Sequence, residues 1–221
     1  TTAPRPSGRA GAWKRAEQFC LLDHPIVELA GRTLGVVGLG TLGRRTAQLG
    51  KALGMRVLVA QTPGSPGMER PVTAADLGVA DGQLDPDERR RWPLMELLPR
   101  VDAITLHCPL TGHTRNLIGA AELARMKPGA FLINAGRGGL VDEQALVAAL
   151  RSGGLAGAGV DVLTREPPRD GNPLLEPGIP NLIVTPHSAW GSREARQRIL
   201  DQLAENIRSW KAGSPTRLVS G

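Results

Sequence analysis

Six short apolar runs are spaced along the chain between residues 34 and 185. They are rich in Val, Ile, Leu and Ala, and none alternates strictly between polar and apolar residues. Continuous apolar runs of this length are typical of strands that are covered on both faces. We therefore predict strands at Leu34–Val37, Met55–Ala60, Ala103–Leu106, Ala130–Asn134, Ala156–Val162 and Leu182–Thr185.

Segments with a helical spacing of apolar residues lie between these runs. Asp142 is typical of a capped helix start, while Pro128-Gly129 and Gly153-Gly154 are typical of helix ends. The predicted helices are Leu42–Leu53, Pro93–Leu98, Ala120–Met126 and Asp142–Ser152. Strands that alternate with helices indicate right-handed βαβ units. The predicted fold class is therefore α/β, with a doubly wound parallel sheet.

Three regions fall outside this alternation. Residues 1–29 begin rich in Pro, Gly and Arg and continue as a mixed segment. Residues 61–91 hold many Pro, Gly and Asp residues, so we expect a long loop or insertion there, with room for a helical turn. Residues 192–211 carry apolar side chains at spacings near four, which predicts an amphipathic helix. Its apolar stripe has to be buried against something beyond the sheet.

Composition narrows the class of protein. The chain has 221 residues, of which 41% are hydrophobic and 22% charged, which is enough to fold around a sizeable core. No apolar run approaches the roughly 18 residues of a membrane span, and no signal-peptide pattern opens the sequence. Two cysteines, Cys20 and Cys108, are too few for a disulfide framework. We expect a soluble, cytoplasmic protein with no membrane partner.

The net charge of +6 raises the question of a nucleic-acid partner. The one tight basic cluster, Arg89-Arg90-Arg91, follows Asp85, Asp87 and Glu88, and we interpret it as a solvated charged loop. An aromatic content of 3% leaves few side chains for stacking on bases. We therefore expect no nucleic-acid partner.

A glycine-rich turn follows the first predicted strand. Residues 38–43, Gly-Leu-Gly-Thr-Leu-Gly, fit the pattern G-x-G-x-x-G and lie between a strand and a helix. Gly38 allows the tight turn, Gly40 lets the backbone approach a pyrophosphate, and Gly43 lets helix and strand pack closely. Unpaired amides at the helix start then face the anion. This context predicts a dinucleotide site.

The residue that ends the second strand distinguishes NAD from NADP in such sites. An acid there normally binds the adenosine ribose, but here the residue is Gln61. A neutral amide still bonds ribose hydroxyls and does not repel a 2′-phosphate. No arginine lies in the next several positions to bind such a phosphate. The sequence therefore predicts NAD or NADP and leaves the choice between them open.

Polar residues gather in three later segments at the ends of predicted strands, where open parallel sheets bind their ligands. These segments are Asn134–Glu143, Gly159–Pro168 and Thr185–Trp190. Together with the glycine motif they resemble the D-isomer-specific 2-hydroxyacid dehydrogenases. Further matches are Leu29–Gly35, Leu106–Thr111 and Met126–Ala130, and the resemblance runs from about Trp13 to Lys211. The tracts Phe19–Pro25 and His187–Arg196 are most similar to the glycerate dehydrogenase/hydroxypyruvate reductase branch.

The resemblance implies a Rossmann-like domain and hydride transfer between NAD(P)H and a short 2-oxo or D-2-hydroxy acid, such as hydroxypyruvate or glyoxylate. It assigns catalysis to three residues. Arg137 would bind the substrate carboxylate, which a planar guanidinium matches bidentately. His187 would be the general acid and base, since imidazole exchanges protons near neutral pH. Glu166 would hold the other ring nitrogen.

The resemblance also assigns the binding residues. Those implied for the cofactor are Gly38, Gly40, Thr41, Leu42, Gly43, Gln61, His107, Cys108, Pro109, Ala135, Gly136, Arg137, Asp161 and His187. The substrate would contact Arg137, and Trp190 either packs over the substrate or anchors the following helix. No metal site is expected.

The chain also departs from the family. The resemblance implies a protein of about 310–330 residues with an N-terminal substrate lobe, and we expect that this lobe is not part of the sequence. We therefore expect a linker or partial substrate-domain segment at 1–29, the dinucleotide-binding domain at 30–186, and a C-terminal helix of an incomplete second domain at 187–221. The resemblance implies a homodimer. An alternative function is a non-catalytic dinucleotide-binding module that acts as a sensor or assembly protein.

Overall fold

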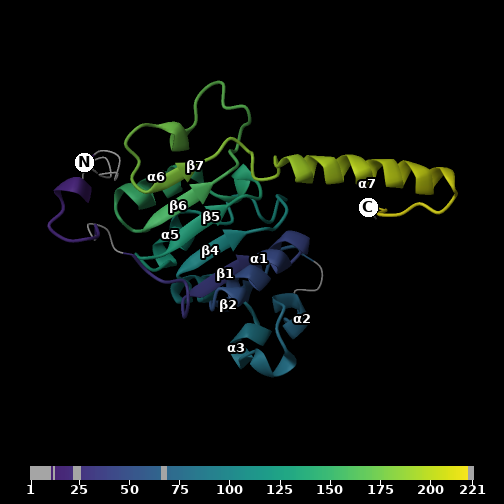
Figure 1. The fold of residues 1–221 in the computed structure, drawn as a ribbon, viewed down its shortest axis with the longest axis horizontal. Helices are drawn as coiled ribbons and strands as arrows, with labels where there is room; N and C mark the ends of the chain where they lie inside the picture. Colours follow the sequence, from purple (N-terminus) through teal and green to yellow (C-terminus); the bar gives the residue numbers. More distant parts are fainter. Residues whose placement is uncertain (1–10, 12, 22–25, 66–68, 219–221) are drawn as a thin grey trace. The chain divides into compact units, whose positions relative to one another are not determined.

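Seven strands within the described residues, which are 11, 13–21, 26–65 and 69–218, form one parallel sheet (Figure 1). Their order is β3-β2-β1-β4-β5-β6-β7, so the chain runs outwards from β1 to one edge and returns to β4 beside β1. The strands are β1 Thr33–Val37, β2 Arg56–Ala60, β3 Arg91–Trp92, β4 Ala103–Leu106, β5 Phe131–Asn134, β6 Gly157–Val160 and β7 Leu182–Val184. The predicted doubly wound sheet and its six strands are confirmed, and β3 is an additional strand.

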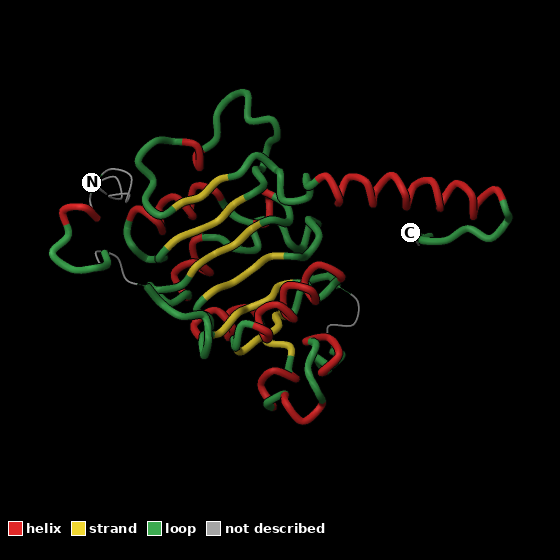
Figure 2. Tube along the Cα trace, viewed as in Figure 1, coloured by secondary structure: helices red, strands yellow, loops and turns green. Residues whose placement is uncertain are grey.

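Helices connect the strands, as Figure 2 shows in red between the yellow strands. The α-helices are α1 Thr41–Ala52, α2 Ala74–Leu77, α3 Pro86–Arg89, α4 Leu94–Leu97, α5 Ala120–Arg125, α6 Glu143–Arg151 and α7 Arg193–Lys211. Short 3-10 helices lie at η2 Trp13–Arg15, η3 Asp81–Gln83, η4 Leu98–Arg100, η5 Gly138–Leu140 and η6 Pro173–Leu175. Asp142 caps α6 through the amide of Ala145, at 3.1 Å. The predicted helices and this capped start are confirmed.

The sheet separates two apolar cores, because successive strand residues point to opposite faces. In β2, Val57 and Val59 belong to one core, whereas Leu58 and Ala60 belong to the other. The first core includes Ala47 of α1 and Leu77 of α2. The second is formed with α4, α5 and α6. Helices therefore cover both faces of the sheet around β1 and β2.

The far half of the sheet differs from the prediction that every strand is covered on both faces. In β5, exposed and buried residues alternate although the strand is largely apolar. Phe131 and Ile133 are 43% and 39% exposed, and Ile183 of β7 is 68% exposed. The prediction is wrong for this face of β5 and β7. An apolar strand sequence shows that a face is suited to burial, but it does not show that another part of the chain covers that face.

The segment between β2 and β4 is more ordered than the predicted insertion. It contains α2, α3 and the edge strand β3. Two capping boxes start the helices: Thr73 pairs with Asp76, and Asp85 pairs with Glu88. Such caps explain why short helices form in a stretch rich in Asp.

The interpretation of the basic cluster as a solvated loop is wrong in part. Arg91 begins β3 and is half-buried, where it extends the sheet beside β2. Just before the cluster, Glu88 is buried and accepts hydrogen bonds from the Nζ of Lys51 at 2.7 Å and the amide of Val57 at 2.9 Å. Arg90 is exposed and pairs with Glu96 at 3.0 Å. A buried carboxylate requires such partners, so the acidic residues are part of the fold.

Contacts divide the chain into two compact units, Thr1–Val184 and Thr185–Gly221. The second unit contains α7, which Ser192 caps through the amide of Ala195 at 3.1 Å. The predicted amphipathic helix is confirmed, and its Ile199, Leu203 and Ile207 are about half exposed. Among the helices of the described residues, none is long and apolar enough to cross a membrane.

Candidate functional site

Five strands of the first unit end at the same edge of the sheet, because the strands are parallel. A predicted cofactor residue directly follows each of them. These residues are Gly38 after β1, Gln61 after β2, His107 after β4, Ala135 after β5 and Asp161 after β6. The strand order reverses between β1 and β4, and ligands of open parallel sheets bind at such a reversal.

The glycine turn is built around close contacts at this reversal. Gly38 has a φ of +93°, and a Cβ there would lie 2.6 Å from the backbone nitrogen of Cys108. A Cβ on Gly43 would overlap the carbonyl oxygen of Gly38. Gly40 differs, because no atom lies within 4 Å of where its Cβ would be. The backbone therefore packs closely at Gly38 and Gly43, whereas the space around Gly40 is open.

The start of α1 has the electrostatics of an anion site. Gly40 is the N-cap and has no side chain to bond the first amides of the helix. The first intrahelical bond runs from the amide of Arg44 to the oxygen of Gly40, so the amides of Thr41, Leu42 and Gly43 precede it. The first turn contains no acidic residue. Open amides and the positive end of the helix dipole fit the pyrophosphate of a dinucleotide.

The β4 end lies against this turn. The amide of His107 donates to the oxygen of Val37 at 2.7 Å, and the Nε2 of His107 lies 3.0 Å from the hydroxyl of Thr105. Burial lowers the pKa of His107, which favours the neutral ring at pH 7. Burial also raises the pKa of Cys108 to about 11, so it remains a thiol. His107 and Cys108 therefore add no charge next to the glycine turn, and the amides of that turn are the groups suited to bind an anion.

Arg137 is presented on a turn that Asn134 holds. Asn134 is buried, and its Nδ2 donates to the oxygen of Arg137 at 2.9 Å while its Oδ1 accepts from the amide of Gly136 at 3.1 Å. The guanidinium of Arg137 is exposed, and its Nη1 donates to the oxygen of Gly136 at 2.7 Å. Asn134 is a positioning residue that the sequence analysis did not single out. The signal for it was a polar residue at the end of an apolar strand.

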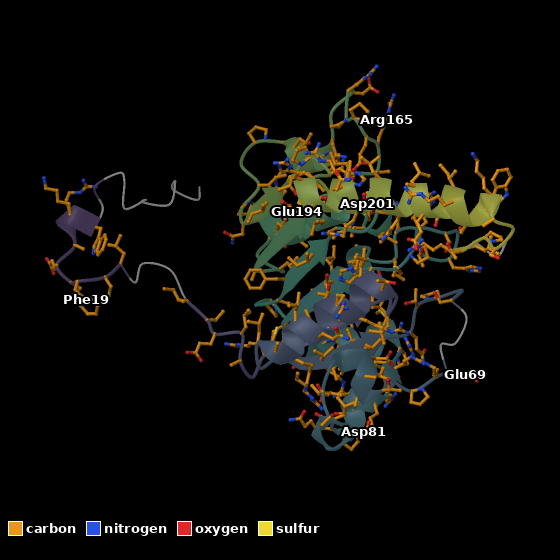
Figure 3. The ribbon with its side chains drawn as sticks, turned by 45° about the vertical axis from the view of Figure 1, so that its right-hand side comes forward. Phe19, Glu69, Asp81, Arg165, Glu194 and Asp201 are labelled. Atoms are coloured by element: carbon orange, nitrogen blue, oxygen red, sulfur yellow. The ribbon has the colours of Figure 1, made fainter. Side chains whose placement is uncertain are left out.

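The loop after β6 carries Asp161 and Glu166. Asp161 is buried, whereas Glu166 is exposed and accepts from the amide of Leu163 at 2.7 Å. Arg165, labelled in Figure 3, extends from the outer part of this loop and pairs with Asp170. The loop thus fixes the carboxylate of Glu166 by a backbone bond next to a charged turn.

The remaining predicted residues belong to the second compact unit. His187 is half-buried and has a φ of +49°, and Trp190 is 53% exposed. The first unit brings together the glycine turn, Arg137 and the other strand-end residues. Glu166 belongs to the first unit and His187 to the second, so the predicted contact between them stays a prediction.

Gln61 lies against the edge strand β3. Its amide donates to the oxygen of Trp92 at 2.8 Å, and its Nε2 donates to the oxygen of Arg91 at 3.4 Å. The Nε of Arg91 in turn donates to the oxygen of Arg70 at 2.8 Å. The sequence places no arginine directly after Gln61, but the fold brings arginines there from distant segments.

Comparison with known proteins decides the family. Residues 3–189 match the model of the D-isomer specific 2-hydroxyacid dehydrogenase, NAD binding domain. The chain belongs to this family. A glycerate dehydrogenase from Methylorubrum extorquens is 46% identical over 213 residues, which are 96% of this chain and 60% of that protein. A hydroxypyruvate reductase from Blautia hydrogenotrophica is 37% identical over 95% of this chain and 60% of its own length.

Solved structures of the 2-hydroxyacid dehydrogenase fold agree with this assignment. An acyclic imino acid reductase in complex with NADPH and D-Arg has a TM-score of 0.74 and 29% identity, covering 96% of this chain and 61% of that one. A D-isomer specific 2-hydroxyacid dehydrogenase from Lactobacillus delbrueckii ssp. bulgaricus, in its NAD complexed form, has a TM-score of 0.71 and 27% identity, covering 97% and 63%. The predicted family, fold and NAD or NADP cofactor class are confirmed.

The match covers only part of each relative. It spans about three fifths of the length of the curated relatives it matches. The shared region is the NAD-binding domain of the 2-hydroxyacid dehydrogenases. The roles of individual residues, the substrate and the assembly remain predictions.

Proposed function

We propose that this chain is the cofactor domain of an NAD(P)-dependent D-2-hydroxyacid dehydrogenase. One observation carries the proposal: the open anion site at Gly40 and the turn that presents Arg137 lie at the same carboxyl edge of one sheet. An anion cradle alone fits any nucleotide. A guanidinium at the same edge of the sheet fits a substrate that carries a carboxylate.

The proposed substrates are short 2-oxo acids such as hydroxypyruvate and glyoxylate. Relatives of this chain are named glycerate dehydrogenase, hydroxypyruvate reductase and glyoxylate reductase. Arg137 would hold the substrate carboxylate through paired hydrogen bonds, which also fixes the orientation of the carbonyl group. Asn134 would maintain this position by keeping the turn in place.

His187 would move the proton. A bound dinucleotide supplies the hydride, and His187 would donate a proton to the carbonyl oxygen, or accept it when a hydroxy acid is oxidised. Its φ of +49° supports a functional role, since non-glycine residues in this region cluster at active sites. Glu166 would hold the other ring nitrogen and fix the orientation of the ring.

The proposal also covers the domain organisation, the cellular compartment and the oligomeric state. Residues 30–186 would form the dinucleotide domain, residues 1–29 a linker or partial substrate-domain segment, and residues 187–221 the C-terminal helix that returns to the substrate domain. Cys20 and Cys108 are free thiols, which supports a reducing compartment, and we place the enzyme in the cytoplasm. We expect a homodimer, which a molar mass of one chain by light scattering would contradict.

Oxidation of NADPH and NADH with hydroxypyruvate or glyoxylate tests this function in the protein at its full natural length. His187→Gln should lower kcat by roughly 10²–10⁴-fold, the usual contribution of a general acid. His113→Gln, at an exposed histidine elsewhere, is the matched control and should retain activity.

A second function, a sensor or assembly module that binds the dinucleotide without turnover, is favoured by Gln61, which stands where an acid normally binds the adenosine ribose. Tight cofactor binding, with no oxidation of NADPH or NADH by either 2-oxo acid, would support it and contradict catalysis. Unchanged kcat in His187→Gln would remove the assigned proton donor.

A further inference from the structure

Three arginines from separate segments lie near the carboxyl end of β2 and are linked by hydrogen bonds. Arg44 comes from the first turn of α1, Arg70 from the loop before α2, and Arg91 from the start of β3. Register places Arg91 beside Val59, two residues before Gln61. Figure 3 labels Glu69, the residue next to Arg70, at the outer side of this region.

One carboxylate joins two of these arginines. The Oδ1 of Asp76 accepts from the Nε of Arg44 at 2.8 Å, and its Oδ2 accepts from the Nη2 of Arg70 at 2.9 Å. The amide and hydroxyl of Thr73 also donate to Oδ2, at 3.0 and 2.9 Å. Asp76 is buried, and despite that burial these donors lower its pKa. Its two oxygens are therefore fully used within the fold.

The third arginine is not neutralised in this way. Within the described residues, Arg91 has no carboxylate within 4.0 Å, and its Nε donates to the backbone oxygen of Arg70. Burial, together with repulsion from Arg70 and Arg44, lowers the pKa of Arg91. Asp76 is the one carboxylate with which these arginines pair among the described residues, and its single negative charge does not balance three guanidiniums. An additional anion at this place would relieve the repulsion between them.

The location identifies the anion. In a dinucleotide-binding fold, the adenosine ribose lies at the end of the second strand, and NADP differs from NAD by a phosphate on the ribose 2′-oxygen. An acid at this position would repel that phosphate, whereas Gln61 is neutral. Gln61 also bonds the carbonyl of Arg91, so the ribose position and the arginines are contiguous. The hydroxyl of Thr62, the next residue, is buried and has no partner among the described residues.

We propose that Arg44, Arg70 and Arg91 bind the 2′-phosphate of NADP(H), so that the protein selects NADP(H) over NAD(H). This inference rests on the proposed dinucleotide function and adds the choice of cofactor to it. Guanidiniums suit the role because each presents several donors in a plane that matches phosphate oxygens. Asp76 is a positioning residue that holds two of the three arginines.

Calorimetric titration of the protein with NADPH and NADH, in the absence of substrate, tests the inference. We expect the Kd for NADPH to be at least about tenfold lower, the range of one strong charge-assisted contact. The fragments 2′,5′-ADP and 5′-AMP should differ in the same direction, because they share the adenosine and differ in the 2′-phosphate. Added salt should reduce the difference.

Variants locate the effect. Arg91→Gln should reduce the ratio of the two Kd values by roughly five- to tenfold, since one charged contact is lost. Gln61→Glu should reduce it without touching any arginine. Arg90→Gln is the matched control, because Arg90 is adjacent, exposed and paired with Glu96. The midpoint of thermal unfolding of each variant checks that the fold is intact.

The outcomes distinguish the proposed selectivity for NADP(H) from the dinucleotide function on which it rests. Equal or tighter binding of NADH would overturn the inference and leave the dinucleotide function standing. An Arg91→Gln variant in which both Kd values change by the same factor would also overturn it. Failure of both dinucleotides to bind would refute the proposed function itself.

Discussion

Replacing Gly40 by aspartate separates the structural role of the glycine turn from its binding role. The backbone of Gly40 has a φ of −77°, which any residue adopts, and space surrounds the position of its Cβ. Aspartate is among the preferred N-cap residues, and its carboxylate interacts favourably with the helix dipole. The same carboxylate would occupy the place proposed for the pyrophosphate. Stability and cofactor binding should therefore change in opposite directions.

The magnitudes follow from the two roles. An aspartate N-cap gains a few tenths of a kcal/mol over glycine, and the dipole adds about 0.3–1 kcal/mol. For a chain of this size the midpoint of thermal unfolding should rise by roughly 1–4 °C. Two charge-assisted hydrogen bonds lost from the pyrophosphate cost at least about 3 kcal/mol, which is roughly a hundredfold in Kd.

The assay uses two measurements on each protein. Thermal unfolding without ligand gives the change in stability, and calorimetric titration gives the Kd for NADPH and NADH. Gly40→Asn is the matched control, because asparagine caps the helix with the same shape and no charge. It should stabilise the protein similarly and weaken binding less. A Gly40→Asp variant that binds both cofactors within threefold of the wild type would refute the assigned anion site.

Three further substitutions test other parts of the account. Asn134→Ala removes the two bonds that hold the Arg137 turn, so steady-state kinetics should give a KM for the 2-oxo acid raised roughly thirtyfold, at ~1 kcal/mol per bond; an unchanged KM would contradict that role. Lys51→Met leaves the buried carboxylate of Glu88 unpaired and should lower the urea unfolding free energy by about 3–5 kcal/mol. Adding Glu88→Leu should recover part of this loss, and no recovery would show that the charge is not its cause. Hydrogen bonds from the Thr33 amide and Lys127 lower the pKa of Asp102 despite its partial burial. The ionised carboxylate of Asp102 therefore stabilises the fold above pH about 4, and this stabilisation is lost as the pH falls below that value. Asp102→Asn should therefore be less stable than the wild type at pH 7, with the gap narrowing as the pH falls below about 4; a gap of the same size at pH 7 and at pH 2 would contradict this.

Much of the fold could be predicted because its signals are local. The apolar run Leu34–Val37 and the glycines that follow it indicate a strand, a turn and a helix without reference to the rest of the chain. Strand β3 could not be predicted in this way, because Arg91 and Trp92 form no apolar run and become a strand only by pairing with β2. Its existence depends on a contact across 32 residues.

The candidate site shows the same division. The strand ends that carry Gly38, Gln61 and Arg137 follow from the strand predictions, since parallel strands end at one edge. The meeting of Arg44 with Arg70 could not be predicted, because it depends on a shared bond to Asp76 across the insertion. No pattern in the sequence near Gln61 records it.

The most direct measurement of the central claim is a crystal structure of the protein grown with NADPH. We expect pyrophosphate oxygens within hydrogen-bond distance of the amides at the start of α1, and the 2′-phosphate among Arg44, Arg70 and Arg91. A dinucleotide bound with its pyrophosphate away from the turn at residues 38–43 would contradict the account.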